Sequence, residues 1–594
     1  MWTAYTSVRS EQRVGRTPHP HTRLKTEYFS GIALYYRRMG RIGALDAALR
    51  RLAANESDAA VRELSEQGAS TPDAYLTALL SLSLYVNQRF EAASETAARA
   101  VRESTDAEAL QLSRAIAGMT LSGWPDVSLA SGETDHIRAA LDDLHSLEGV
   151  EPDSVAFIHY LLAEGALACA RLTLAGEIVE RTGPLPDSFL ATNGVSNPYL
   201  TVMEVMRVRL LGFQGRITEA LALGEAALER SHHPRTRIIV EATMCLVRGN
   251  AAQKSAVRAI ADRLESTEPA PADYLTSGCY LLVAFGLIAT ADLARAARFV
   301  ILAGQTPGLE KLTVIDRALG LEMLAAAAVA EGDLVSAQAW RSQAEPLLAN
   351  DIARPTVQRL ISRVELLAGD AEAAERWAQL GLDGARADGR AVEAAESEIV
   401  LSRARISLAQ RGRASVSLEA MATEALNSGH LAARQSAARE LRNIGRRLRP
   451  TAGSGFDGLS QRERDVALLV VEGFGNIAIA AELHLSEHTV QVHVSRVLAA
   501  FGVASRFALA AKLADDLPDA ARVTAPPALT PRQDAVVDLI VQGFSNDQIG
   551  RELGVSVKTV EKHVSEVFRR WGLASRIGVS RLARSRVRAA PASE

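Results

Sequence analysis

The 594-residue sequence predicts an all-α protein, with a long array of helical repeats followed by two copies of one small helical unit. From Gly31 to Leu448, apolar residues recur with the 3.6-residue period of a helix, and alternating β-branched runs are essentially absent. Short Gly, Asp and Asn breaks recur in that region at intervals of about 40 residues. Nearer the C-terminus, a stretch of 48 residues repeats without a gap.

The composition is that of an ordinary globular protein. Apolar residues make up 48% and charged residues 23%, which excludes wholesale disorder. The net charge of −4 gives no overall attraction to nucleic acid, so any basic surface must be local. Cys169, Cys245 and Cys279 lie far apart without metal-ligand spacing, and we expect buried, reduced thiols in a cytoplasmic protein. Residues 1–30 lack the apolar run of a signal peptide and are expected to form a disordered leader.

One uncharged stretch, residues 274–291, is the only membrane candidate in the sequence. It contains Ser, Thr, Gly and Tyr, and it runs directly into an amphipathic segment. These features favour a buried helix of the array over a spanning helix, so we expect no membrane contact.

Within the helical region, three of the breaks superimpose closely. The equivalent break residues are Ala291, Gly332 and Gly369, and each is followed eight residues later by a large aromatic residue, Phe299, Trp340 and Trp377. Gly412 continues the series 43 residues after Gly369. A repeat near this length, with a turn before an Ala-rich helix, indicates a helix-pair solenoid, and a non-repeating helical bundle is the alternative.

The repeat resembles tetratricopeptide-type repeats with a degenerate signature. The resemblance implies that residues 31–448 form a sensor or interaction domain, whose concave face binds an unknown small-molecule, peptide or protein ligand. No P-loop, H-E-x-x-H, G-x-S-x-G or C-x-x-C motif occurs, and the histidines of "HPHT" and "SHHP" lack metal-ligand spacing. We therefore expect no enzyme, no cofactor and no metal site.

The repeated stretch predicts two four-helix units. Residues 449–458 and 517–528 are expected to be linkers, which leaves units at 459–516 and 529–588. Aligned from Leu459 and Leu529, the copies share 22 of 48 residues. Predicted N-caps for the first, third and fourth helices are Ser460 or Thr530, Ser486 or Ser556, and Ser505 or Ser575. A tight turn joins the second and third helices, which predicts a helix-turn-helix.

Both copies resemble the DNA-binding domain of LuxR-type transcriptional regulators. The shared features are R-x-R-x-V (Arg462 to Val466), G-x-x-N, I-A-x-x-L, S-x-x-T-V-x-x-H and G-V-x-S-R. The overall layout resembles MalT/LAL-type regulators, but this sequence lacks their P-loop ATPase and shows no receiver module. The resemblance implies a cytoplasmic bacterial transcription regulator that binds promoter DNA in the major groove, with RNA polymerase as a further partner. Because the family often dimerises through the fourth helix, either a homodimer or an internal pseudo-dimer of the two units is expected.

The third helix has a predicted core face and a predicted DNA face. At 100° per residue, Val490, Val494, Val497, Leu498 and Phe501 form one apolar stripe, and the opposite strip is where the family contacts bases. The predicted DNA-binding residues of the first unit are His488, Thr489, Gln491, Val492, His493, Ser495, Arg496 and Arg506. Those of the second unit are Lys558, Thr559, Glu561, Lys562, His563, Ser565, Arg569 and Arg576.

The two copies differ in charge. Residues 459–512 carry no net charge and residues 529–582 carry +2, so we expect the second unit to anchor the protein on DNA. The first unit either reads bases through Gln491 and Val492 or serves packing and dimerisation. The family usually has a lysine where Gln491 and Glu561 stand, so its base preference does not transfer.

Three further expectations concern single residues and the protein as a whole. His493 and His563 are expected to make structural or phosphate-side hydrogen bonds and not to sense pH. Arg506 and Arg576 either bind phosphate or pair with a carboxylate. The alternative function is a helical-repeat adaptor protein whose helix-turn-helix units have degenerated.

Overall fold

The computed structural model describes residues 39–70, 72–120, 135–267, 270–448, 455–513, 529–542, 544, 546–571 and 579. Within these ranges the protein is all-α and contains no β-strand, only an isolated bridge between Thr192 and Val195. The expected leader at 1–30 and the expected linker at 517–528 lie outside the described residues, as do Ser575 and Arg576.

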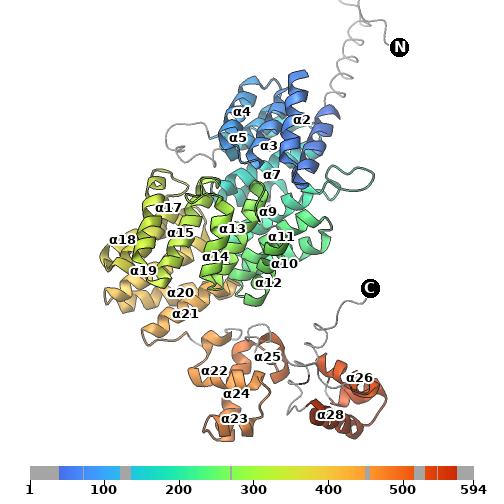
Figure 1. The fold of residues 1–594 in the computed structure, drawn as a ribbon, viewed down its shortest axis with the longest axis vertical. Helices are drawn as coiled ribbons and strands as arrows, with labels where there is room; N and C mark the ends of the chain where they lie inside the picture. Colours follow the sequence, from blue (N-terminus) through green and yellow to red (C-terminus); the bar gives the residue numbers. More distant parts are fainter. Residues whose placement is uncertain are drawn as a thin grey trace, which may run out of the picture.

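The array begins with a helix over residues 39–53 and continues to α21 (Figure 1). Its further elements are α2 (Ser57–Ser70), α3 (Ala74–Val86), α4 (Phe90–Glu103), α5 (Ala107–Thr120), α6 (His136–Asp142), η3 (Leu144–Leu147), α7 (Pro152–Ala168), α8 (Leu172–Thr182), α9 (Tyr199–Phe213), α10 (Ile217–Arg230), α11 (Pro234–Asn250), α12 (Lys254–Thr267), α13 (Tyr274–Ala289), α14 (Leu293–Gly304), α15 (Val314–Glu331), α16 (Leu334–Ala344), η4 (Glu345–Ala349), α17 (Arg354–Ala368), α18 (Ala371–Ala387), α19 (Ala391–Ser407), α20 (Arg411–Ser428) and α21 (Leu431–Asn443).

The two small units follow, beyond α20 and α21 in Figure 1. Their elements are η5 (Gly455–Gly458), α22 (Gln461–Val471), α23 (Asn476–Glu482), α24 (Glu487–Phe501) and α25 (Arg506–Leu513) in the first, and α26 (Pro531–Val541), α27 (Asn546–Leu553) and α28 (Val557–Trp571) in the second.

Consecutive helices of the array pack as pairs, and a left-handed residue marks the turn inside each pair whose connecting residues the structure describes. Six of these residues follow one another at intervals of 37 to 41 residues: Gly215, Ala252, Ala291, Gly332, Gly369 and Ala409. The predicted repeat is therefore present and extends further than the sequence pattern showed. Gly412 is a wrong assignment, because it lies inside α20 and Ala409 takes the left-handed conformation in its place. A left-handed alanine costs only about 1 kcal/mol, so this turn does not require glycine.

Small residues bring the first helices of neighbouring pairs close together. A Cβ on Gly249 of α11 would lie 2.5 Å from the Cα of Gly286 in α13, so only glycines fit this crossing. Of the three predicted aromatic residues, Phe299 is fully buried, whereas Trp340 and Trp377 pack at the half-buried edge of the core. Alanines fill the deepest positions of the second helices, which is why the larger indoles remain at the edge.

Helix α13 lies inside the array, as predicted for this apolar stretch. Most of its aliphatic and aromatic residues are buried, and the helix packs on α11, α14 and α3. In the part of the chain that the structure describes, no helix is long and apolar enough to cross a membrane. The three cysteines are buried free thiols, as expected, and burial raises the pKa of Cys169 and of Cys245 to about 12.

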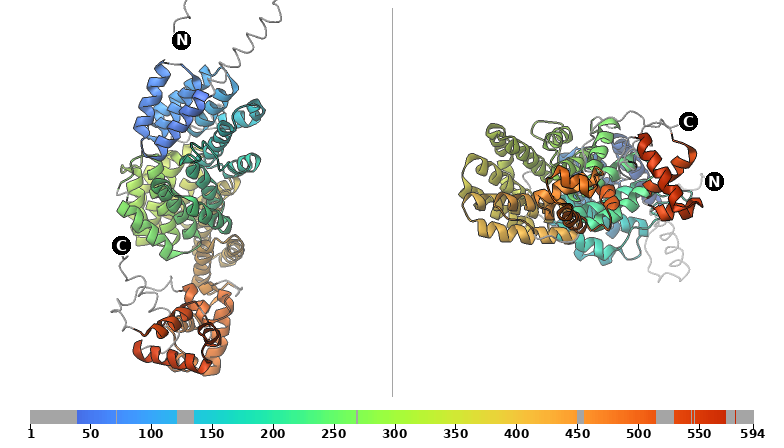
Figure 2. Two further views of the ribbon diagram at one scale, coloured as in Figure 1. Left: turned by 90° about the vertical axis from the view of Figure 1, so that its right-hand side faces the viewer. Right: turned by 90° about the horizontal axis from the view of Figure 1, so that it is seen from below.

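The array closes on itself as a tight superhelix. Helices five pairs apart along the chain touch: α3 packs on α13, α9 on α19, and α11 on α21. Arg390 makes a further contact between distant parts of the array. It is 2% exposed and donates to the carbonyl oxygens of Ala170 at 3.1 Å and Ile352 at 2.8 Å. Beside it, the amide of Leu172 donates to the Asp388 carbonyl at 3.1 Å. Figure 2 shows the stacked layers from two further directions.

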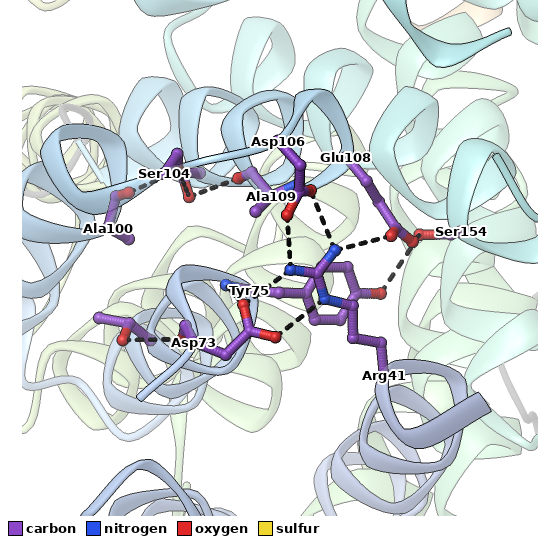
Figure 3. A network of polar contacts seen from close by, with 11 residues as sticks. Arg41, Asp73, Tyr75, Ala100, Ser104, Asp106, Glu108, Ala109 and Ser154 are labelled. Carbon is purple, nitrogen blue, oxygen red and sulfur yellow. Dashed lines mark hydrogen bonds and ion pairs between the residues drawn. The ribbon is translucent and has the colours of Figure 1, made fainter. Parts of the chain in front are cut away.

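A buried ionic network ties the first pairs together (Figure 3). Arg41, 5% exposed, donates to the carboxylates of Asp73, Asp106 and Glu108 at 2.8 to 3.0 Å. Ser154 of α7 donates to Glu108 at 2.8 Å, which extends the network to the next pair. Burial opposes the charge on Arg41, but the hydrogen bonds and charges of Asp106 and Asp73 outweigh it and raise the pKa of the guanidinium. Removal of one partner from such a network leaves an uncompensated buried charge.

Each of the two small units has its own core. The first is built from α22 to α25 around Val466, Val490 and Phe501, and the second from α26 to α28 around Val536 and Val560, with Val579 packed against it. The expected linker at 449–458 needs correction at its end. Residues 455–458 form η5, and the ring of Phe456 packs edge-on against Phe501 with centroids 5.0 Å apart. An apolar ring in the predicted linker thus joins the domain core.

Candidate nucleic-acid interface

Each unit begins at a capping box. The hydroxyl of Ser460 accepts from the Glu463 amide at 3.2 Å, and the Glu463 carboxylate accepts from the Ser460 amide at 2.8 Å. Thr530 and Gln533 make the same exchange at 3.3 and 3.0 Å. These bonds satisfy amides at the helix start that have no partner within the helix. Both predicted N-caps are confirmed.

The arginine of the R-x-R-x-V motif fixes the helix-turn-helix geometry. Arg462 of α22 donates to the carbonyl of Leu483, at the end of α23, and its counterpart Arg532 donates to the Leu553 carbonyl at 2.6 Å. Each arginine satisfies a carbonyl that the helix end leaves without an amide partner. His484 and Gly554 then make the turn with φ of 50° and 64°.

The predicted recognition helices start at serine caps, as expected. The Ser486 hydroxyl accepts from the Thr489 amide at 3.1 Å and bonds the Thr489 hydroxyl at 2.7 Å. Ser556 and Thr559 repeat both contacts at 3.1 and 2.8 Å. The hydroxyls of Thr489 and Thr559 are therefore held by the cap.

The apolar stripe of the third helix faces the core as predicted. In α24, Val490, Val494, Val497 and Phe501 are buried and Leu498 is half-buried. In α28 the buried residues are Val560, Val564, Val567 and Trp571. The exposed residues of the opposite strip are His488, Gln491, Val492, Ser495 and Arg496 in the first unit and Lys558, Glu561, Lys562, Ser565 and Arg569 in the second. Contact of these residues with DNA remains a prediction.

The two strips differ in whether their cationic side chains form ion pairs. Arg496 donates to the Glu463 carboxylate at 3.3 Å, and Arg569 pairs with Glu566 on its own helix. Lys558 and Lys562 are exposed and form no ion pair within the described part of the chain. The strip of α28 thus has two free ammonium groups, whereas the strip of α24 has no unpaired lysine or arginine.

The two motif histidines lie beside the strips. His493 is half-buried, and its Nδ1 lies 3.7 Å from the Glu463 carboxylate without making a hydrogen bond. His563 is half-buried at the same position of α28. Their placement between core and strip matches the expected flanking position, and phosphate contact by either ring remains a prediction.

Arg506 has a structural role that neither expected alternative described. Its guanidinium donates to the Phe474 carbonyl at 3.2 Å and to the side-chain oxygen of Asn476, the asparagine of the G-x-x-N motif. Burial lowers the pKa of Arg506. The contact links the start of α25 to the start of α23, and no carboxylate takes part in it. The counterpart Arg576 lies outside the described residues.

The first unit exposes apolar side chains where the second is polar. Leu468, Phe474, Ile477 and Val492 are exposed by 39%, 39%, 73% and 38%. The equivalent residues of the second unit are Asp538, Phe544, Asp547 and Lys562. Phe474 is the exception among these four residues, because its equivalent Phe544 is also aromatic. The first unit is thus the more apolar of the two on its surface as well as the less charged.

The sequence interpretation missed a cavity inside the superhelix. Its volume is about 120 Å³, and it is lined by the first helices of five consecutive pairs, α7, α9, α11, α13 and α15, together with Ala170, Leu172 of α8 and residues at the start of α19. Its polar residues include Tyr160, Glu164, Arg209, Tyr274 and Asp316. The available signal was weak: Glu164 and Arg209 lie in predominantly apolar helices that also carry other charged residues.

Known proteins are similar to the two units over short stretches. Residues 457–513 and 527–583 both match the family described as "Bacterial regulatory proteins, luxR family". "Putative HTH-type transcriptional regulator Mb0914c" of Mycobacterium bovis is 47% identical over 68 residues, which are 11% of this chain and 8% of that protein. "Response regulator Rre1" of Synechocystis is 44% identical over 54 residues, 9% of this chain and 23% of that protein. The chain therefore spans less than a quarter of these relatives.

Among solved structures, the chain is similar to one in "Crystal structure of APC/C hetero-tetramer Cut9-Hcn1", with 11% identity, a TM-score of 0.24, and coverage of 78% of this chain and 94% of that one. A TM-score this low carries no argument about the array. The repeated family match, the confirmed caps and the confirmed core stripe identify the two C-terminal units as helix-turn-helix domains. The two C-terminal helix-turn-helix domains, at residues 457–513 and 527–583, therefore match the luxR family of bacterial regulatory proteins.

Proposed function

We propose that the protein is a sequence-specific DNA-binding transcription regulator whose second helix-turn-helix domain anchors it on promoter DNA. The observation that carries this proposal is the pair of exposed, unpaired lysines on α28, Lys558 and Lys562. They are four residues apart, so both lie on the same face of the helix, opposite the buried valines. Two free ammonium groups there can each neutralise a phosphate and release a counterion.

The first domain supplies sequence discrimination in this proposal. The strip of α24 offers Gln491 and Val492, both exposed. A glutamine amide matches the donor and acceptor pattern of adenine in the major groove, and a valine methyl packs on the thymine methyl. Such contacts add selectivity, whereas phosphate contacts set the orientation. Two domains in one chain would then read two adjacent half-sites as an internal pseudo-dimer.

The remaining parts of the proposal concern the rest of the chain. Residues 31–448 act as the sensor for a ligand or protein partner, and residues 459–516 and 529–588 act as the two DNA-binding domains. RNA polymerase is the expected partner at the promoter, and the cytoplasm is the expected compartment. The sequence contains no P-loop, H-E-x-x-H, G-x-S-x-G or C-x-x-C motif, which supports a role other than catalysis.

The test is selection of genomic DNA fragments by the full chain, followed by footprinting and measurement of the Kd for the selected site and for a scrambled one. A regulator should prefer its site by roughly 10³-fold or more at physiological salt. Two adjacent protected half-sites per chain would support the pseudo-dimer. Equal, weak binding to both sequences would contradict the proposed function.

The exposed apolar residues of the first domain favour one second candidate, an adaptor that uses this domain to hold a protein. Under that function, the variant Leu468→Asp with Ile477→Asp, which copies the residues of the second domain, would abolish partner binding. Site-specific DNA binding would then be absent from the wild-type protein as well, and the same selection experiment decides between the two candidates.

A further inference from the structure

The cavity inside the superhelix is lined by apolar, aromatic and charged side chains. Leu282, Phe285, Ile315 and Leu319 form part of the apolar wall, and the rings of Phe213 and Phe285 meet edge-on with centroids 5.6 Å apart. A cavity of about 120 Å³ has room for several water-sized groups, since one water needs roughly 10–15 Å³ of this volume. Its walls come from separate helix pairs, so the site exists only when the superhelix is closed.

Most charged groups of the lining are already neutralised by ion pairs. One terminal nitrogen of Arg209 lies 2.6 Å from both oxygens of Glu164. Arg390 is bonded to two backbone carbonyls and pairs with Asp388 at 2.7 Å. Glu393 accepts from Arg359 at 2.9 Å. These contacts leave no unpaired cation that could attract an anionic ligand.

Asp316 differs from the other charged groups in the lining. One of its oxygens accepts from the Thr313 hydroxyl at 2.7 Å as part of the cap of α15. The carboxylate forms no ion pair with any described residue, although Arg209 is close enough to influence it. Burial raises the pKa of Asp316, and a cation placed beside it would offset that effect.

Two tyrosines line the same cavity as this carboxylate. Tyr160 and Tyr274 both line the cavity, and the charge of Asp316 acts on Tyr274. Burial, Tyr85 and Asp316 raise the pKa of Tyr274, so its ring stays neutral and electron-rich. A neutral aromatic face beside a carboxylate is the arrangement that recognises an ammonium group.

We infer that the cavity binds a small molecule with an apolar body and one cationic nitrogen, which pairs with Asp316 between Tyr160 and Tyr274. This inference rests on the sensor part of the proposed function and names its ligand class. An anion is disfavoured because the two arginines of the lining are already engaged. A purely apolar molecule would leave the carboxylate of Asp316 without a counter-charge.

The test uses three probes that differ only in charge: phenylbutylamine, phenylbutyrate and phenylbutanol. Calorimetric titration of the full chain should show the amine binding roughly tenfold more tightly than either of the others. Asp316→Asn keeps an acceptor for Thr313 but removes the charge, and it should abolish the preference for the amine. Glu372→Gln, which removes an exposed carboxylate on α18, should leave the preference unchanged.

A cavity-filling variant tests the location of the site. Gly278 lines the cavity from within α13, and a Cβ at this position would meet no atom within 4 Å. Gly278→Leu should therefore fold, with a Tm no lower than that of the wild type because glycine is a poor helix residue, and bind none of the probes. Equal binding of all three probes by the wild type, tighter binding of phenylbutyrate, or unchanged binding by a folded Gly278→Leu protein would overturn the inference.

DNA binding is measured separately in the same preparations. Amine binding without any site-specific DNA binding would refute the proposed function and leave the inference standing. DNA binding without any preference for the amine would refute only the inference.

Discussion

The two LuxR-type domains of this chain are built alike but expose different recognition helices. Both begin with a capping box, both tie the end of the second helix to a motif arginine, and both bury a valine stripe. Where the first domain exposes His488 and Val492, the second exposes Lys558 and Lys562. The difference shows that the contacts which hold a helix-turn-helix together can persist while the electrostatics of its outer strip change.

A second difference concerns the cap residue of the first helix in each domain. In the first domain the cap residue Glu463 also pairs with Arg496, whereas the second domain has Gln533 and Glu566 at these positions. The carboxylate that completes the cap in the first domain thus neutralises the nearest arginine of its strip. In the second domain a neutral amide completes the cap, and Glu566 pairs with Arg569 and lies within electrostatic reach of Lys562.

The largest expected effect comes from Lys558→Ala with Lys562→Ala. The two lysines should each contribute about 1 kcal/mol, so the Kd for the selected DNA site should rise roughly 30-fold at physiological salt. Fluorescence anisotropy with labelled DNA measures the change. The matched control is His488→Ala with Val492→Ala at the equivalent positions, which should raise the Kd less than about fivefold. A larger loss in the control would reverse our assignment of the anchor.

The reverse exchange should make the first domain resemble the second. His488→Lys with Val492→Lys places two ammonium groups on the exposed strip of α24 and should tighten DNA binding roughly tenfold at low salt. The control, Leu468→Lys with Ile477→Lys, adds the same charge at exposed positions outside this helix. If both variants bind equally tightly, net charge and not the strip explains the gain.

Replacement of Arg506 by methionine separates structure from phosphate binding. The change removes the donors to the Phe474 carbonyl and Asn476, so it should destabilise the first domain by about 1 to 3 kcal/mol. Hydrogen exchange of α22 to α24 in the full chain measures this loss. The second domain should be unaffected. Unchanged exchange combined with a large loss of DNA affinity would instead indicate a phosphate contact.

The smallest expected effect concerns Glu463→Gln, which copies Gln533 of the second domain. Burial opposes ionisation of Glu463, but hydrogen bonds from Ser460 and Arg496 outweigh it and lower the pKa of the carboxyl. A group with a depressed pKa stabilises the fold above its unfolded pKa and loses that contribution as the pH falls through the folded value. Thermal unfolding of the first domain should therefore be less sensitive to pH below about 4.5 in the variant than in the wild type.

Local features of the two domains could be predicted from sequence. The caps at Ser460 and Ser486 and the stripe through Val490 depend on residues within one helix or its first turn. The pairing of Arg496 with Glu463 and of Arg506 with Asn476 joins residues 33 and 30 positions apart. Such contacts depend on how helices pack in space, so the pattern of one helix does not reveal them.

In the array, too, local features could be predicted from sequence, whereas contacts between distant residues could not. Its repeat could be predicted because each turn is local, although the turn before α20 lies at Ala409 and not at Gly412. Closure of the superhelix depends on contacts such as Arg390 with Ala170, 220 positions apart. The cavity follows from that closure, so Asp316 could not be assigned to a site from sequence.

The central claim is that two free lysines on α28 anchor the protein on DNA. Its most direct test is the slope of log K against log salt concentration for the wild type and the two matched alanine variants. Loss of two phosphate contacts should reduce the slope by about 1.8 in Lys558→Ala with Lys562→Ala. The slope of His488→Ala with Val492→Ala should stay within about 0.5 of the wild type, because no phosphate contact is lost. Equal slopes for the lysine variant and the wild type would contradict the account.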